Sequence, residues 1–389
     1  MLAIRAARLF DGLSPVLVEK PTLLVADGRV AAVRASGEVP AGADVVDLPD
    51  ATLLPGLIDA HTHLAFDAST DPVGSLASAS DGEVLDGMRA AARTALAAGI
   101  TTVRDLGDRD YLALRLREEL AGESTSGPQV LAAGPPITTP RGHCWYLGGE
   151  AAGVDGVRAA VRAHAERGVD VIKVMASGGE MTPGTRPHLP QFGLDELRAA
   201  AEEAHRFGLP ATAHAHSGRA IADAVTAGFD SIEHCSFMTE DGVEPLPDVI
   251  EAIARSGVMV CATLGVRPGA VPPPRIAARL EEFTALFRRM KQAGVTIVCS
   301  SDAGIGPSKP HDVLPYSVLM LIETQGWSAA EALEAATSRA ARLCRVEDRK
   351  GRLAPGLDAD ILAVAGDPLT RPRALLDVAA VFREGHRVR

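Results

Sequence analysis

The middle of the chain alternates short apolar runs with alanine-rich segments of helical period. Between the apolar runs, several helical segments end at glycine, a common signal at a helix C-terminus. Eight such βα units in succession predict an α/β fold with a (β/α)8 TIM barrel, and periodicity alone leaves a doubly wound open sheet as the alternative. The predicted strands cover residues 53–64, 101–106, 129–134, 169–176, 210–215, 231–235, 258–264 and 296–301. The predicted helices include residues 83–98, 157–167, 195–207, 221–227 and 278–293.

The two ends of the chain show a different pattern, in which apolar and polar residues alternate over short runs separated by turn residues. Such runs flank Asp27-Gly28 and Glu384-Gly385, and Ser36-Gly37 marks a further turn. These are hairpin signals. Neither end has enough strands to bury a sheet face alone. We therefore predict one small β-sandwich domain, formed by residues 1–52 and 346–389, beside a barrel domain at residues 53–345.

Composition and charge narrow the classes of partner. The 389 residues are 47% hydrophobic, which is enough for a large core, and the net charge of -11 comes without a basic block. This argues against nucleic acid or an anionic membrane surface and leaves a small-molecule substrate. No uninterrupted apolar stretch of about 18 residues and no secretory leader are present, so a cytoplasmic location is expected. The sequence does not decide whether the chain forms a homo-oligomer.

The five cysteines are odd in number, widely scattered and without Cys-x-x-Cys spacing. This pattern predicts neither a disulfide framework nor a zinc ribbon. We expect most of them to be small buried apolar residues.

The first predicted strand ends in His61-Thr-His63. Side chains at positions i and i+2 of a strand point to the same face, so the two imidazoles can act together on a metal ion. A His-x-His pair also occurs by chance or on a polar strand face, so the rest of the chain has to decide.

Other candidate ligands lie in or at the ends of later predicted strands. The carboxyl ends of barrel strands form one rim, where barrel enzymes place their chemistry. Taken singly, each residue could be a hydrogen-bonded polar side chain or a turn residue, but together they indicate a metal centre. They are Lys173 in the fourth strand, His214 in the fifth, His234 in the sixth and Asp302 after the eighth.

Lys173 stands in an otherwise apolar strand. An unpaired ammonium group there would lose its hydration at high cost. A salt-bridged or snorkelling lysine is one explanation. The other is a carboxylated lysine, whose carbamate oxygens could bridge two metal ions.

These motifs resemble those of the metal-dependent amidohydrolase superfamily, almost from end to end of the chain. The matching elements are the residues 55–63, the strand lysine, the two later histidines, Ser301-Asp302 and residues 356–361. Within the superfamily, residues 172–179, Gln191-Phe192, 213–221 and 231–234 resemble the prolidase-type, imidazolonepropionase-like branch. That branch includes dipeptidases and carboxypeptidases that act on Xaa-Pro, Xaa-Arg and N-acyl amino acids, usually with two zinc ions.

The resemblance implies a pair of divalent metal ions, with Zn²⁺ expected, bridged by N-carboxylated Lys173. One ion would be held by His61, His63, the carbamate and Asp302, and the other by the carbamate with His214 and His234. A metal-bridging hydroxide would then attack an amide carbonyl, with Asp302 as the proton shuttle.

The expected reaction is therefore hydrolysis of an amide bond in a dipeptide, an N-acyl amino acid or a cyclic amide. A lactonase or phosphotriesterase would use a very similar ligand set and stays open. A mononuclear deaminase or imidazolonepropionase is less favoured because such sites do not need the strand lysine. A catalytically silent scaffold would be expected to lack a ligand, and none is missing.

Substrate contacts are expected from residues near the same rim. His143 matches a loop histidine that contacts substrate in the branch, so the resemblance assigns it a catalytic and substrate-binding role. His216 shares a strand face with His214 and stands where some dipeptidases have tyrosine, so it could bind substrate or metal. Guanidinium groups on strand-end loops could bind a substrate carboxylate, although ordinary solvated arginines are the alternative. The candidates are Arg141, Arg186 and Arg267, and residues 267–274 are expected to form a stiff lid edge.

Overall fold

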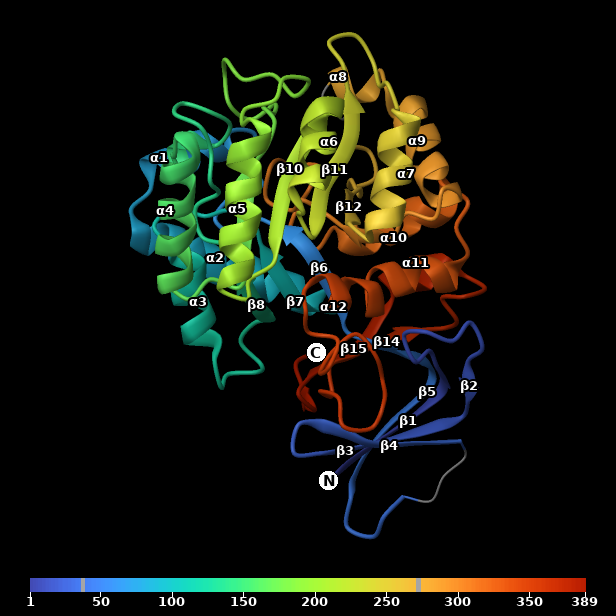
Figure 1. Cartoon of the computed structure of the whole chain (residues 1–389). Helices are drawn as coiled ribbons and strands as arrows, with labels where there is room; N and C mark the ends of the chain where they lie inside the picture. The colour runs from blue at the N-terminus through green and yellow to red at the C-terminus, as the bar shows by residue number, and fades with distance from the viewer. Residues whose placement is uncertain (36–38, 271–273) are drawn as a thin grey trace.

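The computed structural model describes residues 1–35, 39–270 and 274–389. Figure 1 shows a larger region, in which helices surround strands, and a smaller region of strands below it, where both termini lie. The predicted turn at Ser36-Gly37 and residues 271–273 of the predicted lid edge lie outside the described residues.

The described residues of the larger region form eight strands in two parallel sheets, with orders β6-β7-β8 and β13-β12-β11-β10-β9. Each of the eight predicted apolar runs overlaps one of these strands, and five runs contain their strand entirely, so the pattern located all eight. Their bounds are β6 (Leu57–Thr62), β7 (Ile100–Asp105), β8 (Gln129–Ala132), β9 (Ile172–Met175), β10 (Ala211–Ser217), β11 (Ser231–Met238), β12 (Met259–Thr263) and β13 (Ile297–Ser300).

Backbone hydrogen bonds connect the two parallel sheets at both of their edges. Beyond β8, the Ile137 N–H donates to Lys173 O at 2.8 Å, and the Met175 N–H donates to Ile137 O at 2.8 Å. Beyond β13, the Asp302 N–H donates to His61 O at 2.8 Å, and the His63 N–H donates to Ala303 O at 2.9 Å. The ends of β6, β9 and β13 are therefore fixed relative to one another, with their candidate ligands.

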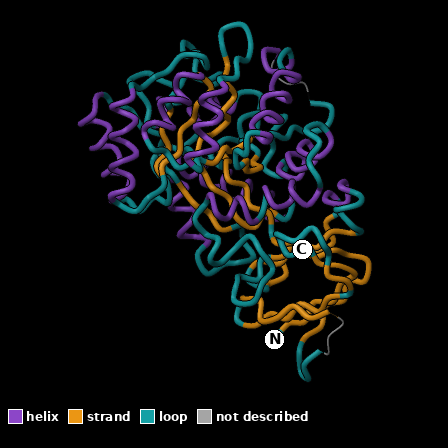
Figure 2. Tube along the Cα trace, turned by 45° about the vertical axis from the view of Figure 1, so that its right-hand side comes forward, coloured by secondary structure: helices purple, strands orange, loops and turns teal. Residues whose placement is uncertain are grey.

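Helices cover the outside of these strands (Figure 2). α2 illustrates the cause: Ser80 caps its first turn in a capping box with Glu83, and its buried stripe includes Val84, Met88 and Ala92. No described helix is long and apolar enough to cross a membrane. The α-helices are α1 (Pro72–Ser78), α2 (Asp81–Ala97), α3 (Leu112–Leu120), α4 (Gly153–Glu166), α5 (Leu194–Arg206), α6 (Gly218–Ala227), α7 (Pro247–Ser256), α8 (Pro274–Ala277), α9 (Leu280–Gln292), α10 (Leu314–Glu323), α11 (Ala329–Ala335) and α12 (Ser338–Leu343), and the 3-10 helices are η1 (Trp145–Leu147) and η2 (Pro372–Leu376).

Strands from both ends of the chain form one further sheet, as the terminal patterns predicted. Its order is β16-β15-β14-β5-β1-β3-β4, with β2 beside β1, and its pairs are antiparallel except for β1 with β5. The sandwich architecture and the domain limits stay predictions. The strands are β1 (Leu2–Leu9), β2 (Val18–Glu19), β3 (Pro21–Ala26), β4 (Arg29–Ala35), β5 (Asp44–Pro55), β14 (Ile361–Ala365), β15 (Val378–Arg383) and β16 (His386–Arg387).

The apolar run at residues 53–64 is divided between two sheets. β5 ends at Pro55 and pairs with β14 of the terminal sheet, whereas β6 begins at Leu57 and pairs with β7. Gly56 stands at the junction, where a Cβ atom would lie 2.1 Å from Thr101 Oγ1. The run is buried along its whole length, so hydrophobicity gives no sign of the division.

The five cysteines are all buried, and none forms a disulfide within the described chain. This agrees with the expectation of small buried residues rather than a disulfide framework.

Candidate metal centre

The residues that the sequence analysis assigned to the metal centre line one cavity of about 940 Å³. Its lining includes His61, His63, Lys173, His214, His234 and Asp302, together with His143, His216 and Arg267.

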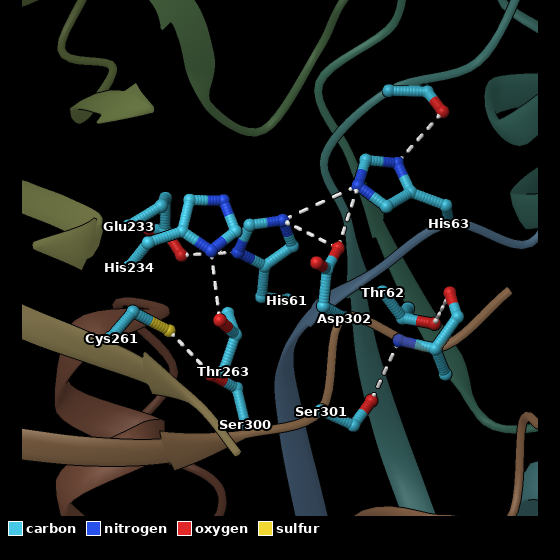
Figure 3. A network of polar contacts seen from close by, with 12 residues as sticks. His61, Thr62, His63, Glu233, His234, Cys261, Thr263, Ser300, Ser301 and Asp302 are labelled. Atoms are coloured by element: carbon cyan, nitrogen blue, oxygen red, sulfur yellow. Dashed lines mark hydrogen bonds and ion pairs between the residues drawn. The ribbon is translucent and has the colours of Figure 1, made fainter. Parts of the chain in front are cut away.

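The first donor group consists of His61, His63 and Asp302, one candidate ligand atom of each lying within 4.8 Å of the others. His61 Nε2 and His63 Nε2 lie 3.4 Å and 3.3 Å from Asp302 Oδ1, and 3.3 Å from each other. Figure 3 shows both rings turned toward the Asp302 carboxylate. Two imidazole nitrogens and a carboxylate oxygen at this spacing could hold a divalent cation.

The other ring nitrogen of each histidine in this group, Nδ1, lies within hydrogen-bond distance of an oxygen atom. His61 Nδ1 lies 2.7 Å from Glu233 Oε2, and His63 Nδ1 lies 3.2 Å from Gly107 O. Arg104 donates to Glu233 Oε1 at 2.8 Å, and Thr212 Oγ1 donates to the same oxygen at 2.6 Å. A histidine that donates one N–H to a carboxylate or carbonyl offers its other nitrogen to a metal. Both Nε2 atoms are thereby prepared as ligands.

The second donor group consists of His214, His216 and His234, again within 4.8 Å of one another. His214 Nε2 donates to Gly178 O at 3.1 Å, which leaves its Nδ1 as the free ligand atom. His234 Nδ1 lies 2.8 Å from Thr263 Oγ1, and His216 Nδ1 lies 2.7 Å from Ser236 Oγ. This group could hold a second cation, and it contains no carboxylate.

Lys173 lies in the same cavity lining and is only 1% exposed. Its Nζ has no hydrogen-bond partner among the described residues. Burial lowers the pKa of Lys173 and so favours its neutral amine. The salt-bridged lysine that the sequence left open is absent from the described ion pairs, and an unpartnered buried amine remains.

The electrostatics favour neutral imidazoles beside an ionised carboxylate. Burial lowers the pKa of His61 to about 4 and that of His216 to about 4. The pKa values of His214 and His234 are also lowered by burial. Burial raises the pKa of Asp302, but His61 and His63 lower it more, so it lies well below its usual range. These are the protonation states that bind metal ions.

His63 differs from the other ligand histidines. Burial lowers the pKa of His63, but the Asp302 carboxylate raises it by a larger amount, so the net pKa is above the ordinary value. A cation between the two side chains would take the place of that proton.

Two candidate ligands have left-handed backbone conformations, His234 at φ 67° and Asp302 at φ 61°. Such conformations cost about 1–3 kcal/mol each in a non-glycine residue and concentrate at functional sites. Gly304 follows with φ 105°, and a Cβ atom there would lie 2.3 Å from His63 O. The chain therefore turns sharply beside the first donor group, where glycine alone fits.

His143 joins the cavity from the loop before η1. Its ring centroid lies 4.8 Å from that of His214, and its Nδ1 lies 3.1 Å from Thr182 Oγ1. Burial lowers the pKa of His143 to about 3, which favours its neutral form. The predicted position of His143 near the metal ligands is thus observed.

The three candidate arginines are not brought together. Arg267 lines the cavity and pairs with Asp312. Arg141 lies over the Trp145 ring, with Cζ 4.9 Å from its centroid, and Arg186 pairs with Glu240 at 3.6 Å. Neither of these two is in the lining that the described residues form. Their predicted contact with substrate stays untested.

Several positioning residues escaped the sequence analysis. Arg104 is buried in β7, but that strand also holds two threonines and Asp105, so its charge does not stand out in the sequence as that of Lys173 does. Glu233 directly precedes His234, and strand alternation would place the two on opposite faces. Lys309 donates to the backbone oxygens of Ser301, Thr263 and Leu264. No sequence signal identifies a lysine that serves only backbone oxygens.

Comparison with known proteins shows which family the chain resembles. The model of the amidohydrolase family matches residues 52–388. Ochratoxinase from Aspergillus niger is 28% identical over 369 residues, covering 85% of this chain and 73% of the relative. Imidazolonepropionase from Salinispora tropica is 26% identical, with 87% and 84% covered. The solved structure of a Xaa-Pro dipeptidase with bound methionine superposes with a TM-score of 0.88 at 27% identity, covering 99% of each chain.

Proposed function

This chain belongs to the amidohydrolase family and is a hydrolytic enzyme, and we propose that it cleaves an amide bond with two divalent cations at the rim of a barrel. The observation that carries the proposal is Lys173. Its unpartnered amine lies in one cavity with two groups of metal-binding side chains. A small-molecule substrate fits a cavity of about 940 Å³.

We infer that the two parallel sheets close into one (β/α)8 barrel. The strand order within the sheets and the hydrogen bonds from Ile137 to Lys173 and from Asp302 to His61 support a continuous ring of eight strands. In such a barrel the carboxyl ends of the strands share one rim, which accounts for ligands that come from five separate strands or strand ends.

The residues fit two cations. The first donor group would hold one of them, and His214 with His234 would hold the other. In each histidine the ligand atom would be the ring nitrogen that is not hydrogen-bonded to a residue outside the two donor groups. A neutral buried amine is the form of lysine that reacts with carbon dioxide, so Lys173 is suited to become a carbamate shared by both cations. Nitrogen and oxygen donors of this kind suit Zn²⁺. When bound, the cations supply Lewis acidity and a water acidified toward neutral pH.

The chain's own residues supply proton transfer and orientation. Asp302 is an ionised carboxylate at neutral pH because of its histidine neighbours, so it can take up a proton and return it to the leaving nitrogen. Neutral His143 has its Nδ1 occupied by Thr182, which leaves Nε2 for the substrate.

Metal analysis and a substrate panel test the proposal together. The purified protein, loaded with zinc in bicarbonate buffer, should contain about two ions per chain. It should hydrolyse at least one amide among dipeptides, N-acyl amino acids, N-acyl amines and cyclic amides. Turnover of only lactones or phosphotriesters by the loaded enzyme would overturn the amide assignment. An unmodified Lys173 in the mass spectrum and in a metal-loaded crystal structure would overturn the carbamate.

A further inference from the structure

We propose that the substrate is an uncharged, apolar amide, without the free carboxylate of a dipeptide or an N-acyl amino acid. A neutral N-acyl amine with a hydrophobic group is the chemical class that fits. This inference rests on the proposed amide hydrolysis and concerns the part of the cavity lining that consists of residues other than the candidate metal ligands.

Much of that part of the cavity is apolar. Side chains of four different loops and of two elements contribute, so the apolar character is not confined to one segment. The contributing residues include Phe66, Met175, Met181, Val266, Ile276 and Ile305. Apolar walls favour a hydrophobic substrate group because they release water when the group binds.

The cations in the described lining are already engaged. They are Lys173, Lys309 and Arg267. Lys309 donates to Ser301 O at 2.6 Å and to Thr263 O and Leu264 O at 3.1 Å each. An ammonium group has three protons, so none is left for a substrate. Lys173 is assigned to the metal centre.

Arg267 is also committed to a partner within the protein. Its guanidinium pairs with Asp312 and lies 5.7 Å from the centroid of the Tyr316 ring. Arg275, which stands between the lining residues Pro274 and Ile276, lies 3.5 Å from Glu180, which is itself part of the lining. Apart from Lys173, the described lysine and arginine side chains of the lining, and Arg275 beside them, therefore have carboxylate or carbonyl partners.

A substrate carboxylate would thus meet apolar walls and the carboxylates of Asp302 and Glu180. Removing a carboxylate from water without a cationic partner is unfavourable. Like charges nearby add repulsion. An uncharged amide avoids both costs, and the imidazoles of His143 and His216 in the lining can still exchange hydrogen bonds with a carbonyl oxygen or an amide N–H.

A matched pair of substrates tests the inference on the zinc-loaded enzyme. N-benzoyl-2-phenylethylamine and N-benzoyl-L-phenylalanine differ only in the carboxylate. We expect kcat/KM to be at least about tenfold higher for the uncharged compound. An equal or higher value for the acid would overturn this inference and leave amide hydrolysis in place. Hydrolysis of lactones or phosphotriesters alone would instead overturn the proposed function, and this inference with it.

A charge introduced into the apolar wall provides the second test. Val266 is half-buried and lines the cavity. Val266→Arg adds a free cation, and Val266→Met is the control that adds length without charge. We expect Val266→Arg to lower the preference for the uncharged amide by about tenfold, whereas Val266→Met keeps it. An equal preference in both variants would show that the charge of the lining does not select the substrate, and the inference would fail.

Discussion

The two donor groups face the same cavity but are held in different ways. In the first group, His61 and His63 are fixed by a carboxylate and a carbonyl oxygen, and Asp302 adds a negative charge. In the second group, His214 is likewise held by a carbonyl oxygen, that of Gly178, but His216 and His234 are held by the hydroxyls of Ser236 and Thr263. A hydroxyl can donate or accept, so it does not fix which nitrogen of a histidine carries the proton.

The difference suggests an unequal dependence on Lys173. The first donor group has an anionic oxygen and preset nitrogens, so it can bind a cation alone. The second donor group has only neutral imidazoles, and a divalent cation there needs a negative charge from elsewhere. A carbamate on Lys173 would supply it. Variants at four positions test this difference between the donor groups.

Lys173→Ala should have the largest effect. Without the shared anion, we expect the ion count to fall from about two per chain to about one, retained by the first donor group. Hydrolysis should fall by more than the ~10–100-fold that is typical of losing an outer-shell partner. Metal analysis and kcat/KM measure the two effects.

Acetate offers a matched control for this variant. Added to Lys173→Ala, it can supply a carboxylate where the side chain has been removed, so the second ion should return in part. Loss of both ions in Lys173→Ala would contradict the independence of the first donor group. Retention of both ions would remove the need for a carbamate.

Glu233→Gln should follow in magnitude. The Glu233 carboxylate orients His61 and pairs with buried Arg104 at 2.8 Å. Leaving a buried charge without its partner typically costs about 3–5 kcal/mol of the free energy of unfolding. Affinity for the first ion should also fall by about 10–100-fold. Urea unfolding of the metal-free protein isolates the first effect.

Glu119→Gln is the control, since Glu119 pairs with Arg89 at 2.8 Å on the surface. An exposed pair contributes roughly 0–1 kcal/mol. If both variants lose the same small free energy, the Arg104–Glu233 pair does not fix the first donor group.

The sequence predicts more of the fold than of the site, and Glu233 shows why. The eight strands follow from apolar runs, and same-face spacing in β6 correctly brought His61 and His63 together. The same rule places Glu233 and His234 on opposite faces. His234, however, has φ 67°, which breaks the alternation, and both side chains reach toward His61. A left-handed non-glycine residue has no reliable signature in a single sequence.

The three candidate arginines do not come together at the cavity, for a related reason. Their loops were placed at strand ends, but a guanidinium on a long side chain goes to the partner that its loop brings near. For Arg186 that partner is Glu240, and for Arg267 it is Asp312. Such pairings depend on how separate loops pack together, which hydrophobic periodicity does not describe.

Thr263→Val should have a moderate effect, confined to the second donor group. It removes the hydroxyl that lies 2.8 Å from His234 Nδ1 while keeping the shape of the side chain. We expect the second ion to bind about 10-fold more weakly and the first to be unchanged. Zinc titration against a competing chelator resolves the two affinities. Thr263→Ser keeps the hydroxyl and should behave as the parent, and equal weakening of both ions would show that the two groups are coupled.

His216→Ala should have the smallest effect if Lys173, His214 and His234 suffice for the second ion. The His216 ring stacks on His234, with centroids 4.6 Å apart and an interplanar angle of 20°. Loss of such a stack costs about 0.5–1.5 kcal/mol, or roughly threefold to tenfold in affinity for the second ion. His216→Phe keeps an aromatic ring without a ligand nitrogen, so it should restore most of that affinity.

A ligand role for His216 would change the comparison between the two donor groups. If His216→Ala and His216→Phe both reduce the ion count to one, His216 is a ligand and the second donor group binds through three imidazoles. That group would then retain its ion in Lys173→Ala, and the unequal dependence on Lys173 would disappear. The double variant Lys173→Ala, His216→Phe separates the two schemes. If His216 only supports His234, the double variant holds the same single ion as Lys173→Ala, whereas a ligand role predicts a further loss.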